Sequence, residues 1–224
     1  MAYFKTGLLM VLMTCIVGFL GTLLAGFEGL IFALLFAGLM NIFAWYKSDS
    51  MVLKMYGAKQ VSESNQLSKI VKSLCRNTNM PMPKVFIIEN PQPNAFATGR
   101  NPDNSSVAAT TGLLERLSQE EVTAVMAHEL AHIKNRDTTI MVITATFAGA
   151  ISMLANFAMF FGSRGRNGIG FIGIIALMIL APLAASLVQM AISRGREYEA
   201  DRIGAEICEN PKWLASALRS IQQM

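Results

Sequence analysis

Charged residues, cysteines and histidines are all scarce in this sequence. Charged side chains make up only 15% of the 224 residues and hydrophobic ones 53%, which is too apolar for an ordinary soluble domain and typical of a membrane protein. The net charge of +4 comes from scattered lysines and arginines that form no basic stripe, so nucleic acid is not an expected partner. The three cysteines, Cys15, Cys75 and Cys208, are widely spaced. They predict neither a disulfide framework nor a cysteine-ligated metal, and they favour a reducing compartment.

The chain has only two histidines, His128 and His132, and Glu129 directly follows the first. Four residues is about one helical turn, so both imidazoles leave the same face of a helix and can bind one metal ion, for which this H-E-x-x-H pattern favours zinc. Ser118 and Glu121 read as a capping box that starts this helix. A buried helix with two satisfied histidines is the alternative. It is disfavoured because Glu129 would lie beside that face with no evident partner of opposite charge.

Four charge-free hydrophobic runs are long enough to cross a bilayer. The first two, separated only by Glu28, predict a hairpin, although a cleaved signal peptide remains an alternative for the first run. Lys5 and Lys47 flank this hairpin and place both of its outer ends in the cytoplasm. Arg164 and Arg166 lie between the last two runs, and they oppose the positive-inside rule if that loop is extracytoplasmic. A second hairpin that crosses the membrane incompletely therefore remains an alternative. The runs are residues 6–27, 29–46, 138–163 and 168–192.

The stretch between the two hairpins has the character of a soluble domain. An apolar stripe at helical spacing predicts an amphipathic helix within residues 62–77, and three short strands are predicted at 84–89, 94–99 and 106–111. We therefore expect an α+β integral membrane protein with about four transmembrane helices and a mainly helical, zincin-like catalytic domain containing a small sheet. Its expected parts are a transmembrane hairpin at 6–46, the first half of the catalytic domain at 47–137, a second transmembrane hairpin at 138–192 and the second half at 193–224.

The third predicted strand lies a few residues upstream of the histidine helix. At an edge of the sheet it would pair with an extended peptide by β-augmentation. Its alternative place is the centre of the sheet. The candidate substrate-binding residues are Asn94, Val107, Ala108, Ala109 and Thr110.

A third zinc ligand is expected after the fourth hydrophobic run, because two-histidine peptidase sites usually add a carboxylate and leave one position for water. Glu197, Glu199 and Asp201 are the candidates. Glu197 and Asp201 lie one turn apart and share a face, so that one can bind the metal while the other accepts a hydrogen bond from a histidine ligand. Glu199 points away from both.

At this point the chain resembles the HtpX-type membrane-bound zinc metalloproteases, relatives of the CAAX prenyl protease. The resemblance runs over nearly the whole chain and includes the N-terminal hairpin, residues 93–99 and 107–114, the H-E-x-x-H helix and residues 193–201. It implies that Glu197 is the third zinc ligand and that Asp201 supports the metal site without binding the ion. It also implies stress-related degradation of unfolded or misfolded membrane proteins by a multi-pass protein of the bacterial inner membrane, with its catalytic domain facing the cytoplasm.

The expected reaction is direct hydrolysis of a peptide bond, in which one zinc ion activates water and Glu129 acts as the general base. Two rival interpretations remain. An intramembrane protease of the site-2 type would place the histidine helix in hydrocarbon, for which the ends of that helix are too polar. A structural zinc would need four protein ligands. A zinc transporter would need ionisable residues within its membrane segments.

Overall fold

The structure, a computed structural model, describes residues 2–141, 182, 186 and 194–222. The chain forms two compact units. One comprises Met1–Ser48 and Ile140–Ser193, and the other comprises Asp49–Thr139 and Arg194–Met224. The second predicted transmembrane hairpin, at 138–192, lies almost wholly outside the described residues.

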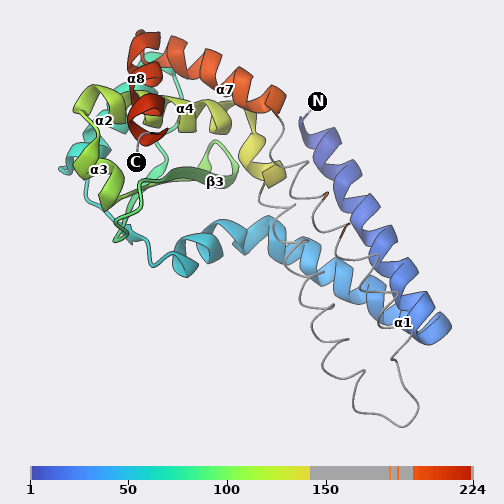
Figure 1. Ribbon diagram of the computed structural model, residues 1–224. Coiled ribbons are helices and arrows are strands. Elements are labelled where there is room, and N and C mark those ends of the chain that lie inside the picture. Colours follow the sequence, from blue (N-terminus) through green and yellow to red (C-terminus); the bar gives the residue numbers. More distant parts are fainter. Residues whose placement is uncertain (1, 142–181, 183–185, 187–193, 223–224) are drawn as a thin grey trace. The chain divides into compact units, whose positions relative to one another are not determined.

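The first unit contains most of helix α1 (Ala2–Met55), which folds back on itself into a hairpin (Figure 1). The reversal occurs at Gly26, whose φ of 60° is left-handed and suits glycine. Across the hairpin, a side chain at Gly21 would collide with Ala33, so the two arms approach closely there. Asn41 donates a hydrogen bond of 2.9 Å to Thr14 on the opposite arm. This stretch is therefore a helical hairpin, with its turn two residues before Glu28.

Large apolar side chains cover the outside of this hairpin. Phe27 and Phe32 expose 74% and 72% of their surface, and Phe19, Leu35 and Leu39 are also exposed, which is unusual for a protein surface in water. Among the described residues, one stretch, Gly26–Phe43, is long and apolar enough to cross a membrane by length and composition.

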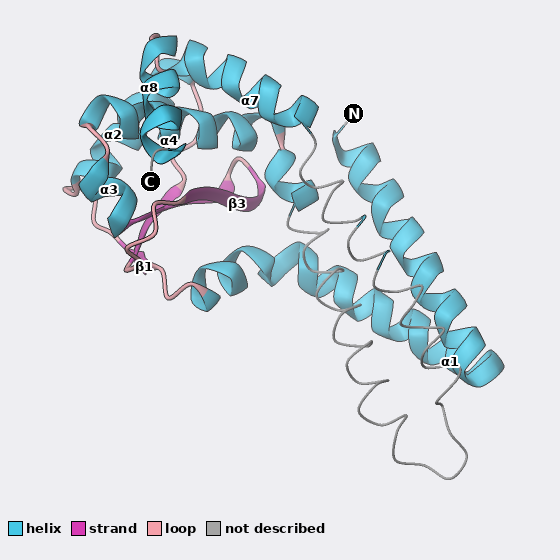
Figure 2. Cartoon of the chain, viewed as in Figure 1, coloured by secondary structure: helices cyan, strands magenta, loops and turns pink. Residues whose placement is uncertain are grey.

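The second unit is a four-stranded sheet with most of its helices on one face (Figure 2). The strand order is β1-β2-β4-β3, with β2 and β4 parallel and the other pairs antiparallel. The strands are β1 (Lys59–Gln60), β2 (Lys84–Ile88), β3 (Ala95–Asn101) and β4 (Asn104–Thr110). The helices are α2 (Gln66–Thr78), α3 (Thr111–Arg116), α4 (Gln119–Asn135), α7 (Arg194–Ile207) and α8 (Pro211–Gln222).

Successive side chains along each strand point to opposite faces of the sheet, so the buried residues form two clusters, one on each face. Val85 and Val107 face the helices, within a cluster built from α2, α4, α7 and α8. Ile88 and Ala108 face the other way and pack with Leu53, near the end of α1. The apolar stripe predicted for the amphipathic helix lies in the core as expected, at Leu67, Ile70, Val71 and Leu74 of α2.

The possibility that the third predicted strand lies at an edge is wrong. This strand, β4, pairs with β2 on one side and with β3 on the other, so its backbone has no free edge for a peptide. The side chains of Val107, Ala108, Ala109 and Thr110 are likewise buried. On this side of the sheet the edge strand is β3, and β1 is the edge strand on the other side. Asn94, directly before β3, is tied to Thr110 by backbone and side-chain hydrogen bonds of 2.9 Å.

Candidate metal centre

Helix α4 carries both histidines and begins where the sequence predicts. Ser118 caps it, accepting a hydrogen bond from the Glu121 N–H, while the Glu121 side chain accepts one from the Ser118 N–H. The predicted capping box is thus confirmed. One turn apart on this helix, the imidazoles of His128 and His132 meet nearly at right angles, with ring centroids 4.8 Å apart.

Helix α7 crosses α4 at His128 because Gly204 has no side chain. A Cβ atom at Gly204 would lie 2.9 Å from the His128 Cα and 3.0 Å from its backbone nitrogen, so any larger residue would force the two helices apart. Glu197 and Asp201 precede Gly204 by seven and three residues, on the same face of α7. This close crossing brings their carboxylates to the imidazoles of α4.

Three donor atoms converge at this crossing. The Nε2 atoms of His128 and His132 are 3.2 Å apart, and Oε2 of Glu197 lies 3.5 Å and 3.8 Å from them. A triangle with these sides has a circumradius of about 2.0 Å, which is the length of a Zn–N or Zn–O bond. The side-chain exposure rises from 6% at His132 to 16% at His128 and 42% at Glu197, so the site opens to solvent on the Glu197 side.

The donor set fits zinc. Two neutral imidazoles that face each other through Nε2 at 3.2 Å either share a proton or share a cation between their lone pairs. Two imidazoles and one carboxylate, with one open side, are the ligand set of catalytic zinc rather than of magnesium or calcium. His128, His132 and Glu197 are therefore the residues that would hold the ion.

Glu129 is partly buried beside this triangle. Burial raises the pKa of its carboxyl group, although His128, His132 and a hydrogen bond from the Ala97 backbone N–H oppose that rise. Ala97 belongs to β3, so the carboxylate lies between the metal-binding face of α4 and the edge of the sheet. A carboxylate of raised pKa is a better proton acceptor than an exposed one.

The remaining ring nitrogens face carboxylates. His132 Nδ1 lies 3.3 Å from Oδ2 of Asp137, and His128 Nδ1 lies 2.9 Å from Oδ1 of Asp201. Burial lowers the pKa of His132, but the Asp137 hydrogen bond and the charges of Glu129 and Glu197 outweigh it, so the pKa is raised. The same negative charges favour a bound cation.

The structure thus brings His128, Glu129, His132, Glu197 and Asp201 together. It leaves Glu199 outside, in ion pairs of the exposed face with Arg202. Sequence reasoning assigned no role in the site to three contributors: Asp137, Gly204 and the backbone of Ala97. For Gly204 a signal existed, because Glu197, Asp201 and Gly204 follow the i, i+4, i+7 spacing of one helical face.

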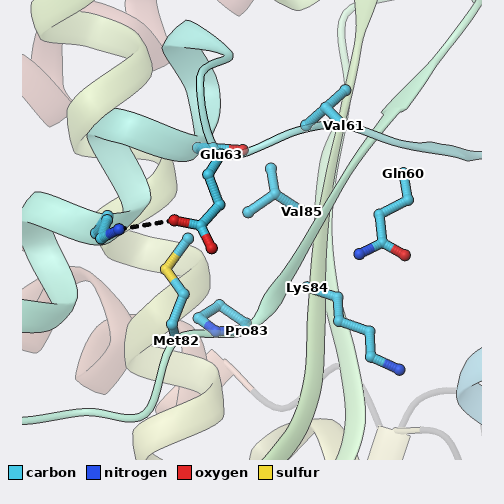
Figure 3. A pocket seen from close by; sticks show the side chains of 9 residues that line it. Gln60, Val61, Glu63, Met82, Pro83, Lys84 and Val85 are labelled. Carbon is cyan, nitrogen blue, oxygen red and sulfur yellow. Dashed lines mark hydrogen bonds and ion pairs between the residues drawn. The ribbon is translucent and has the colours of Figure 1, made fainter.

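A separate hollow of about 270 Å³ lies between α2 and the β1–β2 edge of the sheet. Figure 3 shows the Glu63 carboxylate engaged in an ion pair, which joins it to Lys72 at 2.8 Å, and the Lys84 ammonium directed away from it. The hollow contains none of the metal-centre residues and takes no part in the site. Its lining consists of Gln60, Val61, Glu63, Ser68, Lys72, Met82, Pro83, Lys84 and Val85.

Comparison with known proteins shows which family the chain belongs to. The sequence model described as Peptidase family M48 matches residues 61–223, which include both histidines, Glu129 and Glu197. The crystal structure of S. mikatae Ste24p is similar to the chain with a TM-score of 0.56 and 23% sequence identity, and the match covers 84% of this chain and 50% of that chain. At this identity the likeness shows a shared fold, and the chain spans about half the length of Ste24p. The predicted relationship to HtpX-type and CAAX-prenyl-type metalloproteases is confirmed at the level of the family. The chain belongs to peptidase family M48, a family of metallopeptidases.

Proposed function

We propose that this chain is a zinc-dependent, membrane-bound endopeptidase. His128, His132 and Glu197 hold the metal and Glu129 is the general base. The observation that carries the proposal is the convergence of the three donor atoms on one centre, with the Glu129 carboxylate beside it.

The chemistry follows from what each group offers. When bound, zinc supplies a Lewis acid that acidifies water and polarises a carbonyl group. Glu129 accepts a proton from the attacking water and returns it to the leaving amine. The Ala97 N–H orients the Glu129 carboxylate for this transfer. Hydrolysis is direct, with no acyl-enzyme.

A closed structural zinc site is the rival proposal, and it would need Asp201 as a fourth ligand. Asp201 lies against Nδ1 of His128, whereas the other donors converge at Nε2. Its carboxylate is therefore on the side of the ring that faces away from the common centre. A three-ligand site with an open position supports catalysis.

The edge of β3 is the proposed binding surface for an extended peptide. Asn94 accepts a hydrogen bond from the Thr110 N–H and Phe96 lies opposite Ala108, so the even-numbered residues bond to β4. The intervening Ala95 and Ala97 then direct their N–H groups outwards. The Ala97 N–H meets Glu129, so a peptide paired alongside Ala95 would lie next to the base.

Ala95→Pro tests this surface. Proline removes the outward N–H and is tolerated at the first residue of an edge strand, so we expect folding to survive. Loss of one main-chain hydrogen bond, together with the ring's bulk, should raise KM about tenfold. Ala95→Ser keeps the N–H and is the control. Equal KM values for the two variants, measured on one peptide, would place the substrate elsewhere.

The resemblance to HtpX-type membrane proteases and the exposed apolar surface of α1 both support insertion into a membrane. We propose a multi-pass protein of the bacterial inner membrane with about four transmembrane helices. Its catalytic domain faces the cytoplasm and removes unfolded or misfolded membrane proteins. Charge supports the orientation, because Lys47, Lys54 and Lys59 follow the first hairpin.

The experiment that tests the function uses the whole chain recovered from membranes washed at alkaline pH, a step that itself tests membrane insertion. In detergent, the chain should cleave unfolded casein. A zinc chelator should abolish cleavage, and zinc should restore it, whereas magnesium should not, because imidazole ligands prefer zinc. Cleavage that persists after chelation would refute a metalloprotease.

A further inference from the structure

Asp137 is a buried carboxylate in contact with one of the two histidines. Its Oδ2 lies 3.3 Å from Nδ1 of His132, and the residues are only 7% and 5% exposed. The other nitrogen of this ring, Nε2, faces Nε2 of His128. A carboxylate at Nδ1 holds the proton on that nitrogen and leaves the Nε2 lone pair free for a metal.

The end of α4 aims Asp137 at this ring. The helix ends at Asn135, and Arg136 adopts the left-handed conformation with φ 62°, its N–H donating to the carbonyls of His132 and Ile133. This tight turn places the next residue, Asp137, back beside His132. The backbone turn at Arg136 therefore determines where Asp137 lies relative to His132.

A second anchor follows two residues later. The Thr139 hydroxyl donates a 2.8 Å hydrogen bond to the Arg100 carbonyl at the end of β3, and Thr139 is only 4% exposed. The segment that carries Asp137 is thus held at the helix end and at the sheet. A carboxylate held at both sides retains its geometry at little entropic cost.

The corresponding pair on the other histidine is weaker. Asp201 is 2.9 Å from Nδ1 of His128, but its side chain is 42% exposed and the contact does not form a hydrogen bond, so that Nδ1 has no hydrogen-bond partner among the described residues. Solvent competes for an exposed carboxylate and screens its charge. Asp201 therefore holds the His128 ring less firmly than Asp137 holds the His132 ring.

We propose that Asp137 is the principal positioning residue of the metal centre. It fixes the tautomer and orientation of His132 and contributes more to zinc affinity than Asp201 does. This inference rests on the proposed function only in taking His132 as a zinc ligand.

The test measures zinc affinity by competition with a chromogenic chelator, on the full-length chain in detergent. Asp137→Ala should lower the affinity roughly 10- to 100-fold, as loss of an outer partner of a histidine ligand does. Asp137→Asn, nearly isosteric, keeps an oxygen acceptor without the charge and should fall between the wild type and Asp137→Ala. Asp201→Ala should have the smaller effect, and Glu199→Ala, on the exposed face of α7, should have none.

Two further measurements separate positioning from folding. The thermal midpoint of the metal-free chain should change little in Asp137→Asn, whereas the visible absorption spectrum of the cobalt-substituted protein should change. Unaltered zinc affinity in Asp137→Asn, or a larger loss in Asp201→Ala than in Asp137→Ala, would overturn the proposal. A wild-type chain that binds zinc as expected but cleaves nothing would instead refute the proposed function and leave this inference standing.

Discussion

Glu129→Gln is expected to reduce kcat roughly 10²- to 10⁴-fold while leaving the zinc content unchanged. The amide is nearly isosteric with the carboxylate and can still accept the hydrogen bond from the Ala97 N–H. It cannot accept a proton from water at neutral pH, so only the base is lost. Casein cleavage and bound zinc, measured on the same detergent-purified preparation, check both parts of the prediction.

Glu120→Gln is the matched control, because Glu120 is an exposed glutamate in the first turn of the same helix. It should cleave at the wild-type rate. Equal cleavage by wild type and Glu129→Gln would mean either a contaminating protease or a mechanism in which Glu129 is not the base.

Glu197→Ala is expected to abolish stable zinc binding and, with it, cleavage. The variant removes one of three converging donors and leaves two imidazoles as the remaining protein ligands. The loss of zinc affinity should exceed the roughly 10- to 100-fold typical of outer partners. Zinc content after gel filtration, and zinc affinity by chelator competition, measure the effect.

Glu199→Ala, two residues along the same helix, is the control. Its carboxylate pairs with Arg202 on the exposed face of α7, and exposed ion pairs contribute little. Zinc content should remain at the wild-type level. If Glu197→Ala retained zinc while losing activity, Glu197 would act on the substrate and another group would complete the metal site.

Local features of the fold were predictable because their causes lie close together in the sequence. The capping box at Ser118 and Glu121 needs residues only three apart, and the apolar stripe of α2 repeats at helical spacing. The N-terminal hairpin follows from two apolar runs with a polar break. Its turn lies at Gly26 because a left-handed residue is needed there, and glycine adopts that conformation without strain.

The order of the strands was not predictable in the same way. The sequence of β4 is equally compatible with an edge or a central place, and only long-range pairing with β2 and β3 decides between them. This order matters for function, because the sheet edge that we propose as the peptide-binding surface belongs to β3 and not to β4. Glu129 meets that edge through the Ala97 backbone, which no side-chain pattern reveals.

By itself the sequence determined the histidine pair and its base, since the spacing of His128, Glu129 and His132 within one helix sets which side chains share a face. Only the tertiary structure decided how the carboxylates divide between the two histidines. Gly204 lets α7 approach α4, so that Glu197 reaches the Nε2 atoms and Asp201 reaches an Nδ1. The left-handed turn after α4 returns Asp137 to His132. Helical spacing is a property of the local backbone, whereas the meeting of two faces depends on packing between segments far apart in the chain.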